Sequence, residues 1–539
     1  MTLSGNSVDV YTGSPAPHGE AAQAQPEPQV AGMSGTPQTR VERCVRPAPD
    51  RYRNALGKYR VFRSADCANC GLCAKLCPEG VHSKPEGYAF TLRPQDHKCI
   101  GPACAASDHY CIDKCPQHAL RMTRNPAVDA LTDARWSSDL ILSTWHMAET
   151  GHAPKNGLEY RRGNSGGGFD RIGINVPDDA PAKIDPQEID TGLDLNRSND
   201  GRPQIHIDLP IYGGGMSFGS VSIHTILAKA RTAVAWNTFT CTGEGGYHDR
   251  LKAYDDHVIT QVATGLFGVR EETIQRVRIV EFKYAQGAKP GLGGHLLGDK
   301  NTPAVARMRE AVAGNALFSP FPFHSVYSVE DHKKHLDWIK EMNPRALVSV
   351  KVSTPNDVDM VAVGSYYAGA HIIHLDGSYG GTGAAPDIAK KNIAMPIEFA
   401  IPKVHKFLVA EGIREKVTLI VSGGIRTAAD VVKAIALGAD GVVIGTAEMV
   451  ALGCVRCACC ESGRGCPRGI ASTDPELMMQ MSLDWATQRL INLLSAWREE
   501  IVDVLSKAGL RSTRELRGRS DLLYYMANPS NPGQEGAKS

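Results

Sequence analysis

Residues 205–450 alternate between short apolar segments, glycine-rich loops and segments with helical periodicity, and this alternation limits the folds open to the chain. Neighbouring parallel strands need long crossover connections, which are usually helices, so strand–helix repeats predict a parallel sheet. Helical periodicity follows most of the apolar segments, for example in Ile223–Ala235, Pro303–Ala313 and Ala428–Leu437. The eight expected strands are Pro210–Ser217, Trp236–Cys241, His257–Ala263, Arg278–Lys283, Ala346–Val352, His371–Leu375, Val417–Val421 and Gly441–Ile444.

Eight consecutive units of this kind predict an α/β fold in which residues 201–450 form a closed (β/α)₈ TIM barrel. An open, Rossmann-type sheet is the alternative. It is disfavoured because no G-x-G-x-x-G motif follows an early strand of the pattern.

Composition excludes several classes of function. The 59 Lys and Arg nearly balance the 58 Asp and Glu, so the chain is not a broadly basic nucleic-acid binder. Mean hydropathy is −0.24, and no apolar run reaches the roughly 18 residues that a membrane span needs. The first 30 residues lack the basic start and apolar stretch of a secretory signal. We therefore expect a cytoplasmic protein with no nucleic-acid or membrane partner.

Most of the 15 cysteines fall in two tight groups, which indicates metal or iron–sulfur ligation. The run from Cys67 to Cys77 reads C-x₂-C-x₂-C-x₃-C-P, the spacing of bacterial two-cluster ferredoxins. A looser set from Cys99 to Cys115 ends in the same C-x₃-C-P. Pseudo-twofold pairing then predicts two [4Fe–4S] clusters. The ligands of one would be Cys67, Cys70, Cys73 and Cys115, and those of the other Cys99, Cys104, Cys111 and Cys77.

Zinc is the alternative for this group, since C-x₂-C also binds zinc, but two interleaved sets with trailing prolines favour iron–sulfur. Segment 58–125 has few long apolar runs, so a ferredoxin-like domain there would depend on its clusters for stability. Cys44 lies outside both sets and is expected to be an inert thiol. The other expected divisions are a disordered tail at 1–50, a connector at 126–200, an iron–sulfur loop at 451–472, a helical extension at 473–527 and a loose tail at 528–539.

Two glycine-rich turns follow the last two expected strands, where TIM barrels often bind phosphate. Gly423, Gly424 and Gly445 can bring backbone N–H groups close to a phosphate, and the next helix would direct its N-terminal dipole at the anion. Arg426 and Thr446 are candidate side-chain contacts. Glycine also occurs wherever φ must be positive, so only both turns together favour a phosphorylated cofactor.

Other loops at the same expected rim are rich in small polar residues, and one of them contains Lys289. Glycine and proline surround this lysine, which fits a fixed loop that touches a flat ring or a carboxylate. A solvated surface lysine is the alternative.

At these loops the chain resembles the flavin domain of the glutamate synthase large subunit. The matching stretches are Met216–Ser220, Thr242–Gly246, Glu281–Gly291, Gly381–Ala384, Gly423–Thr427 and the cysteines from Cys454 onward. The resemblance spans about residues 165–475, and with the ferredoxin-like segment it covers most of the chain, as in archaeal-type members.

The resemblance implies an FMN-binding barrel that receives electrons through an iron–sulfur cluster. Such a barrel makes L-glutamate by reducing the 2-iminoglutarate formed from 2-oxoglutarate and ammonia. By resemblance, the catalytic residues are Lys289, Glu244 and Gln286, with Glu244 in the loop that faces the ammonia. The implied flavin or oxo-acid contacts are Met216, Ser217, Gly219, Thr242, Gln286, Lys289, Lys351, Gly381, Thr382, Gly383, Gly423, Gly424, Arg426, Gly445 and Thr446.

Departures from the family pattern bear on the nitrogen donor. The family's amidotransferase and Gly-rich β-helix domains are not found in the sequence, so we expect separate subunits for them, an electron-donor protein and a hetero-oligomer. The loop after Lys289 reads PGLGGHLLG, where the family usually has Glu and Gln. These changes fit the related subunit of N-methylglutamate synthase, in which methylamine replaces ammonia. An electron-transfer scaffold that has lost the oxo-acid site is the third alternative.

The second cysteine group differs from the family pattern by one residue. Cys454, Cys460 and Cys466 read C-x₅-C-x₅-C, whereas C-x₅-C-x₄-C is usual for the family's [3Fe–4S] cluster. Cys457 is a possible fourth ligand, so either [3Fe–4S] or [4Fe–4S] is expected here, with structural zinc as the alternative.

Overall fold

The computed structural model describes residues 41–526, except 52–56, 108–109, 128–134, 155–167, 177–183, 291–293, 321, 382–384 and 462–463. The tail expected at 528–539 and the first forty residues of the tail expected at 1–50 lie outside this range. Residues 41–50 are described, and Ala48 among them is buried, with its carbonyl accepting a hydrogen bond from Arg489 at 2.8 Å.

Eight strands form one parallel sheet in the order β6-β15-β14-β13-β12-β9-β8-β7, and the (β/α)₈ barrel predicted from the sequence is confirmed. A hydrogen bond of 2.9 Å from Gly213 N to Phe239 O joins the two ends of this order. Every expected strand overlaps an observed one, but the first two are shorter than expected. The first ends at Gly213, where two more glycines follow, and the second begins only at Thr240, because the preceding helix continues to Ala235 and Asn237 then has a left-handed φ of 44°. The strands are β6 (Ile211–Gly213), β7 (Thr240–Cys241), β8 (Val258–Ala263), β9 (Ile279–Lys283), β12 (Leu347–Ser353), β13 (Ile372–Asp376), β14 (Thr418–Ser422) and β15 (Gly441–Ile444).

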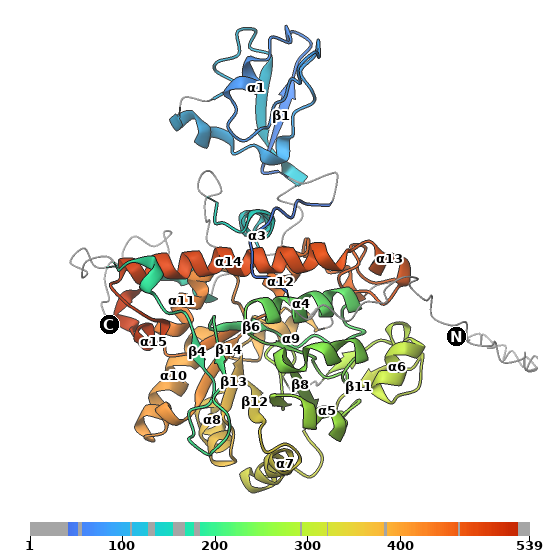
Figure 1. Cartoon of the computed structure of the whole chain (residues 1–539), viewed down its shortest axis with the longest axis vertical. Coiled ribbons are helices and arrows are strands. Elements are labelled where there is room, and N and C mark those ends of the chain that lie inside the picture. Colours follow the sequence, from blue (N-terminus) through green and yellow to red (C-terminus); the bar gives the residue numbers. More distant parts are fainter. Residues whose placement is uncertain are drawn as a thin grey trace, which may run out of the picture. The chain divides into compact units, whose positions relative to one another are not determined.

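Helices follow the strands and cover the outside of the barrel (Figure 1). The second expected helix-forming stretch, Pro303–Ala313, ends early, because Glu310 adopts a left-handed φ of 55° directly after Arg309. The connection from β7 to β8 is a 3₁₀ segment, Asp249–His257. The helices are α4 (Ile223–Ala235), α5 (Glu271–Arg276), α6 (Pro303–Arg309), α7 (Val329–Met342), α8 (Val358–Tyr367), α9 (Asp387–Asn392), α10 (Ile397–Ala410), α11 (Ala428–Ala436) and α12 (Thr446–Ala451).

Outside the barrel, the long helix α14 (Leu483–Lys507) packs against α4 and against α3 (Ser138–Thr150), as Figure 1 shows. Ser137 caps α3 by accepting from Leu140 N, and Gly151 ends it with a φ of 77°. The shorter helices of the two flanking regions are α1 (Leu72–Leu76), α13 (Pro475–Met479) and α15 (Thr513–Leu516). The remaining strands form antiparallel pairs: β1 (Tyr59–Arg63) with β2 (Leu120–Arg124), β3 (Ile172–Ile174) with β16 (Leu523–Tyr525), β4 (Leu193–Asp194) with β5 (His206–Ile207), and β10 (His295–Leu296) with β11 (Leu317–Phe318).

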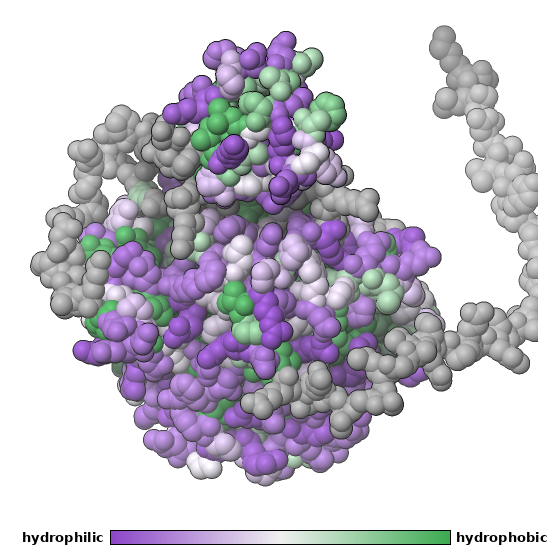
Figure 2. Space-filling view, turned by 45° about the horizontal axis from the view of Figure 1, so that its top comes forward, coloured by the Kyte–Doolittle hydropathy of each residue, from purple (hydrophilic) through white to green (hydrophobic). Residues whose placement is uncertain are grey.

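The barrel interior is apolar at one end and polar at the other. Side chains from the β4–β5 hairpin, such as Leu193 and Ile207, form a buried cluster with the first residues of several barrel strands, among them Ile279, Leu347 and Ile372. The amino ends of the strands are therefore closed by apolar packing, and polar side chains are left for the carboxyl ends. The face shown in Figure 2 is mainly hydrophilic, with apolar residues in separate small patches. Within the described ranges, no helix is long and apolar enough to cross a membrane.

Asp440, just before β15, carries a buried ion-pair network. Its carboxylate pairs with Arg414 and Arg517, each at 3.0 Å, and accepts from Leu419 N at 2.7 Å. Burial alone would raise the pKa of Asp440, but Arg414 and its neighbours outweigh burial and hold that pKa at about 2. The carboxylate therefore stabilises the fold above its unfolded pKa of about 3.9, and the contribution is lost as the pH falls toward 2.

Asp440→Ala is expected to lower the free energy of unfolding by ~3–5 kcal/mol at pH 7, because it leaves the buried guanidinium of Arg414 without its carboxylate partner. The difference in the free energy of unfolding between the variant and wild type should become smaller below pH 4. Urea titrations at pH 7 and below pH 4 measure this difference. Asp521→Ala is the control, since the pair of Asp521 with Arg519 is largely exposed and should contribute about 0–1 kcal/mol. Equal destabilisation by the two substitutions would contradict the assignment.

Candidate functional site

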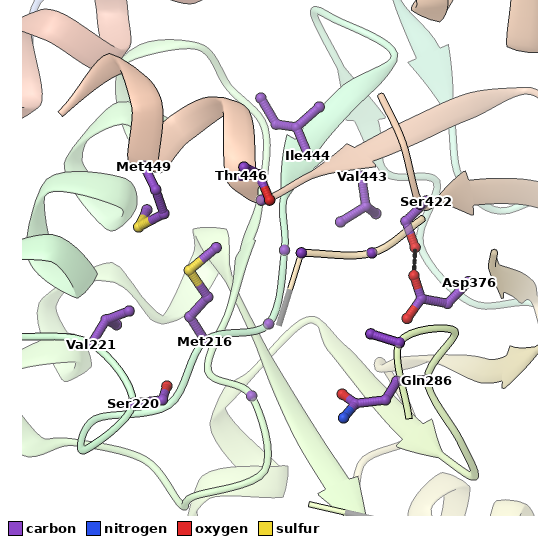
Figure 3. A pocket seen from close by; sticks show the side chains of 18 of the residues that line it. Met216, Ser220, Val221, Gln286, Asp376, Ser422, Val443, Ile444, Thr446 and Met449 are labelled. Atoms are coloured by element: carbon purple, nitrogen blue, oxygen red, sulfur yellow. Dashed lines mark hydrogen bonds between the residues drawn. The ribbon is translucent and has the colours of Figure 1, made fainter. Parts of the chain in front are cut away.

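A cavity of about 300 Å³ lies at the carboxyl ends of the barrel strands, where the βα loops meet. Side chains from β8, β9, β12, β13, β14 and β15 form its wall, together with the loops after β6, β7, β9, β13, β14 and β15. Figure 3 shows Met216, Val221 and Met449 at one end of the cavity, and Asp376 and Ser422 at the other. The cavity therefore has an apolar end and a polar end.

The structure brings most of the expected cofactor and catalytic residues into this cavity. Gly219 and Thr242 do not line it: Thr242 is buried and braces the loop by accepting from Gln261 N. Thr382 and Gly383 lie outside the described residues. The expected residues that line the cavity are Met216, Ser217, Glu244, Gln286, Lys289, Lys351, Gly381, Gly423, Gly424, Arg426, Gly445 and Thr446.

The loop after β14 needs its glycines. Gly423 has a φ of 101°, and a Cβ there would lie 2.6 Å from the carbonyl oxygen of Gly377. The backbone can thus line the cavity where a phosphate was expected. The expected side-chain contact Arg426 is buried, and its guanidinium pairs with Asp170 and donates to Arg135 O at 2.7 Å. A phosphate role for Arg426 stays a prediction.

The cavity carries an excess of positive charge. Of the described residues that line it, seven are Lys or Arg and three, Glu244, Asp376 and Glu461, are acidic. Such a balance favours an anionic ligand. The cations are Arg135, Lys283, Lys289, Arg309, Lys351, Arg426 and Arg456.

Lys289 is a buried cation of the cavity wall that lacks a negatively charged partner among the described side chains. It is 4% exposed. Burial lowers the pKa of its ammonium group, Glu244 opposes that shift and Lys283 adds to it. In the part of the chain that the structure describes, no side chain hydrogen-bonds to or pairs with Lys289 Nζ. A buried ammonium without a partner is costly, so this position favours a carboxylate or phosphate from a ligand.

Arg309 and Lys283 are cavity residues that the sequence did not single out. Arg309, at the end of α6, is 4% exposed; its Nη2 donates to Ser217 Oγ at 2.8 Å, and its Nε has no hydrogen-bond partner among the described residues. Lys283 pairs with Glu244 at 3.1 Å. No motif marks Arg309, because it reaches the cavity from a helix end. A basic residue at the last position of a strand, as in IVEFK, could have indicated Lys283.

The polar end contains a second group that sequence reasoning missed. Ser422 Oγ donates to Asp376 Oδ1 at 2.5 Å and lies 2.8 Å from His374 Nε2, and His374 Nδ1 lies 2.9 Å from Glu281. Lys351 pairs with Asp376 at 3.3 Å. Burial alone would raise the pKa of Asp376, but Lys351 and then His374 outweigh it, so that pKa is lowered.

The second cysteine group borders the cavity. Cys454, Cys460 and Cys466 line it, whereas Cys457 is exposed and does not. Burial, followed by the neighbouring thiols of Cys454 and Cys466, raises the pKa of Cys460 to about 11. Three thiols thus face one another beside the cavity, in the set that the sequence predicted for the cluster nearest the cofactor.

The first cysteine group forms two neighbourhoods, and the expected partition of its ligands between two clusters stays a prediction. Burial is the main cause that raises the pKa of Cys99 to about 11, and Cys104 and Cys77 add to it. A small cavity elsewhere in the segment is lined by Cys67, Cys70, Cys73 and Cys115, with Cys111 also at its wall. Within the described residues, no set of three or more His, Cys, Asp or Glu has the arrangement of a metal site. The iron–sulfur clusters therefore stay a prediction.

Comparisons with known proteins indicate the family to which the chain belongs. A family model described as the conserved region in glutamate synthase matches residues 179–511. The archaeal-type glutamate synthase [NADPH] of Thermotoga sp. (strain RQ2) is 37% identical over 85% of this chain and 92% of its own length. The archaeal glutamate synthase [NADPH] of Archaeoglobus fulgidus is 35% identical over 88% of this chain and 95% of its own.

Among solved structures, a mutant flavocytochrome b2 with pyruvate bound matches at a TM-score of 0.42 and 17% identity, covering 66% of this chain and 76% of that one. The family model alone spans more than half of the residues, and both relatives are matched along nearly their whole length. The chain therefore belongs to the glutamate synthase family.

Proposed function

We propose that the chain is the FMN- and iron–sulfur-binding oxidoreductase subunit of a glutamate synthase, which reductively aminates 2-oxoglutarate, through 2-iminoglutarate, to L-glutamate. The observation that carries the proposal is a cavity with one apolar end, one polar end and an excess of cations around the unpaired ammonium of Lys289. The isoalloxazine ring of FMN has an apolar dimethylbenzene side and a polar pyrimidine side, which match the two ends. When bound, FMN supplies hydride transfer.

The cations have distinct roles in this proposal. Lys289 and the free Nε of Arg309 bind the carboxylates of the oxo acid, and Arg309 also orients the Ser217 hydroxyl toward it. Lys351, whose pKa is raised because Asp376 and Glu281 outweigh burial, stays cationic near the polar end. There it can stabilise negative charge on a reduced cofactor. The glycine backbone at Gly423 and Gly445 with the Thr446 hydroxyl binds the phosphate.

Glu244 and Gln286 are proposed to act on the nitrogen side. The carboxylate of Glu244 is ion-paired with Lys283 and lines the cavity, so it can accept a hydrogen bond from incoming ammonia or from the imine nitrogen. The thiols of Cys454, Cys460 and Cys466 would hold the cluster that delivers electrons. Nitrogen and electrons would reach this chain from separate amidotransferase-like, β-helix and electron-donor subunits.

Product analysis with partner subunits tests the proposal. The holoprotein receives electrons from NADPH through a donor subunit, with 2-oxoglutarate and either glutamine, ammonia or methylamine. We expect L-glutamate with glutamine and with ammonia. If N-methylglutamate forms with methylamine and no glutamate forms with glutamine or ammonia, an N-methylglutamate synthase function would replace the proposed one. Flavin reduction without either product would show an electron-transfer scaffold instead.

A further inference from the structure

The polar end of the cavity opens onto a chain of buried hydrogen bonds that the proposed chemistry does not yet use. Asp376 and Ser422 line the cavity, while His374 and Glu281 lie behind them and do not reach it. All four residues are at most 8% exposed. The contacts run from Asp376 to Ser422 (2.5 Å), from Ser422 to His374 (2.8 Å) and from His374 to Glu281 (2.9 Å). Figure 3 shows the first of these contacts at the cavity wall.

Strand register builds this chain. Asp376 on β13 is the direct cross-strand partner of Ser422 on β14. Glu281 on β9 is flanked in register by Gln261 and Ser349, which both donate to its carboxylate, at 2.7 and 3.1 Å. The carboxylate of Glu281 is therefore ionised and accepts hydrogen bonds from Gln261, Ser349 and His374. Burial alone would raise the pKa of Glu281, but His374 and Lys351 hold it at about 2.

Two arrangements of the hydrogen atoms satisfy every contact in the chain. In the first, His374 is an imidazolium that donates to both Glu281 and Ser422, and Ser422 donates to an ionised Asp376. In the second, Asp376 is a carboxylic acid that donates to Ser422, Ser422 donates to Nε2 of a neutral His374, and Nδ1–H still donates to Glu281. The two arrangements differ by one proton moved from His374 to Asp376 in two hops.

The other titratable groups that face this chain keep fixed charges near neutral pH. Asp376 and Glu281 outweigh burial and raise the pKa of Lys351 on β12, which stays cationic. Burial raises the pKa of Cys241 on β7 to about 12 and that of Tyr212 on β6 well above its usual value, so both stay neutral.

We propose that His374, Ser422 and Asp376 form a proton relay, which stores a proton behind the cavity wall and releases it into the cavity through Asp376. The proposal deepens the proposed function and rests on it in requiring a flavin in the cavity. His374 and Ser422 are positioning residues in this account, since they act through Asp376.

The relay supplies the one proton that reduction of the flavin takes up. Two-electron reduction of an oxidised flavin to its anionic reduced form takes up two electrons, here from one-electron iron–sulfur carriers, and one proton. The Nε2–H bond of His374 breaks as an O–H bond to Ser422 forms, and the original O–H bond of Ser422 breaks as one to Asp376 forms. The Asp376 O–H bond then breaks as the proton passes to the flavin. Solvent returns one proton to His374 through the same groups.

Ser422→Ala tests the relay with Thr418→Val as its matched control. Both substitutions remove one buried hydroxyl from β14, but Thr418 donates to Leu195 O at 2.9 Å and only Ser422 joins His374 to Asp376. The holoprotein is mixed anaerobically with dithionite in a stopped-flow instrument, and flavin absorbance is followed. We expect Ser422→Ala to slow flavin reduction on the order of 10²-fold and Thr418→Val to stay within about twofold of wild type.

Buffer dependence separates a lost proton path from a general defect. The wild-type rate should not depend on buffer concentration, whereas imidazolium buffer should accelerate Ser422→Ala by supplying an external acid. Ser422→Thr, which keeps the hydroxyl, should restore the rate. Flavin content after acid extraction and far-UV circular dichroism check that each variant is folded and loaded. A loaded Ser422→Ala protein whose flavin is reduced as fast as that of Thr418→Val overturns the relay.

His374→Gln covers the case in which Ser422→Ala loses flavin. Glutamine can still donate to Glu281 but stores no proton, so flavin reduction should become slow and buffer-dependent. Fast flavin reduction in His374→Gln, or loss of flavin from both variants while Thr418→Val keeps it, overturns the relay in favour of a structural role. These outcomes are distinct from failure of the proposed function. A wild-type protein without flavin would overturn the proposed function, and so would one that reduces normally but forms no glutamate.

Discussion

Replacing Lys289 by alanine is expected to lower kcat/KM for 2-oxoglutarate by at least about 30-fold, while flavin binding is retained. Lys289 is 4% exposed and lacks a described partner within the protein, so a substrate carboxylate is the group that completes its environment. Removing one partner of a buried charge pair costs ~2–5 kcal/mol, and each 1.4 kcal/mol is a factor of ten in affinity or in kcat/KM. Steady-state glutamate formation with varied oxo acid measures the effect.

Two further variants make this result specific. Lys289→Arg keeps the charge and should recover part of the loss. Lys334→Ala removes a lysine of α7 that is 77% exposed, and should leave turnover unchanged. Flavin content is measured in all three variants. Turnover of Lys289→Ala close to that of wild type would refute the assignment of Lys289 to the substrate.

Cys460→Ala is expected to abolish turnover that depends on the electron-donor subunit, because it would remove a ligand of the iron–sulfur cluster that we propose beside the cavity. The flavin should still be reduced directly by dithionite, since the cavity itself is intact. Iron analysis should show the loss of one cluster, and electron paramagnetic resonance should show which signal disappears. The signals assigned to the front cysteines, from Cys67 to Cys115, should remain.

The neighbouring cysteines give matched controls. Cys459→Ala changes the adjacent residue, which is outside the expected ligand set, and should keep full iron and turnover. Cys457→Ala decides the cluster type, since iron is retained if the cluster is [3Fe–4S] and falls if Cys457 is the fourth ligand of a [4Fe–4S] cluster. Full donor-dependent turnover in Cys460→Ala would contradict a cluster at this position.

The barrel could be predicted because its strands are marked locally. β14 and β15 are buried along their whole length, and the centres of their sequences are continuous apolar runs bounded by glycine or polar residues. The ends of elements were less predictable. The backbone conformation of a single residue, such as the left-handed Glu310, stopped α6 within a stretch that still reads as helical.

The site was predictable only in part, for a related reason. Glycine loops such as that at Gly423 are contiguous in sequence and carry a recognisable pattern. The chain from Asp376 to Glu281 instead arises from the pairing of β9, β12, β13 and β14, which brings together side chains up to 141 positions apart. A usable signal was present: polar residues recur at every second position of otherwise apolar strands, as His374 and Asp376 do.

The central claim is that a flavin in the rim cavity reduces the imine of an oxo acid held by Lys289. The most direct measurement is a single turnover. Anaerobically purified holoprotein is reduced with dithionite, freed of excess reductant and mixed with 2-oxoglutarate and ammonium while flavin absorbance and L-glutamate are followed. We predict that the flavin is reoxidised and that L-glutamate forms in an amount equal to the reoxidised flavin. A flavin that stays reduced, or a folded protein that takes up no FMN, would contradict the account.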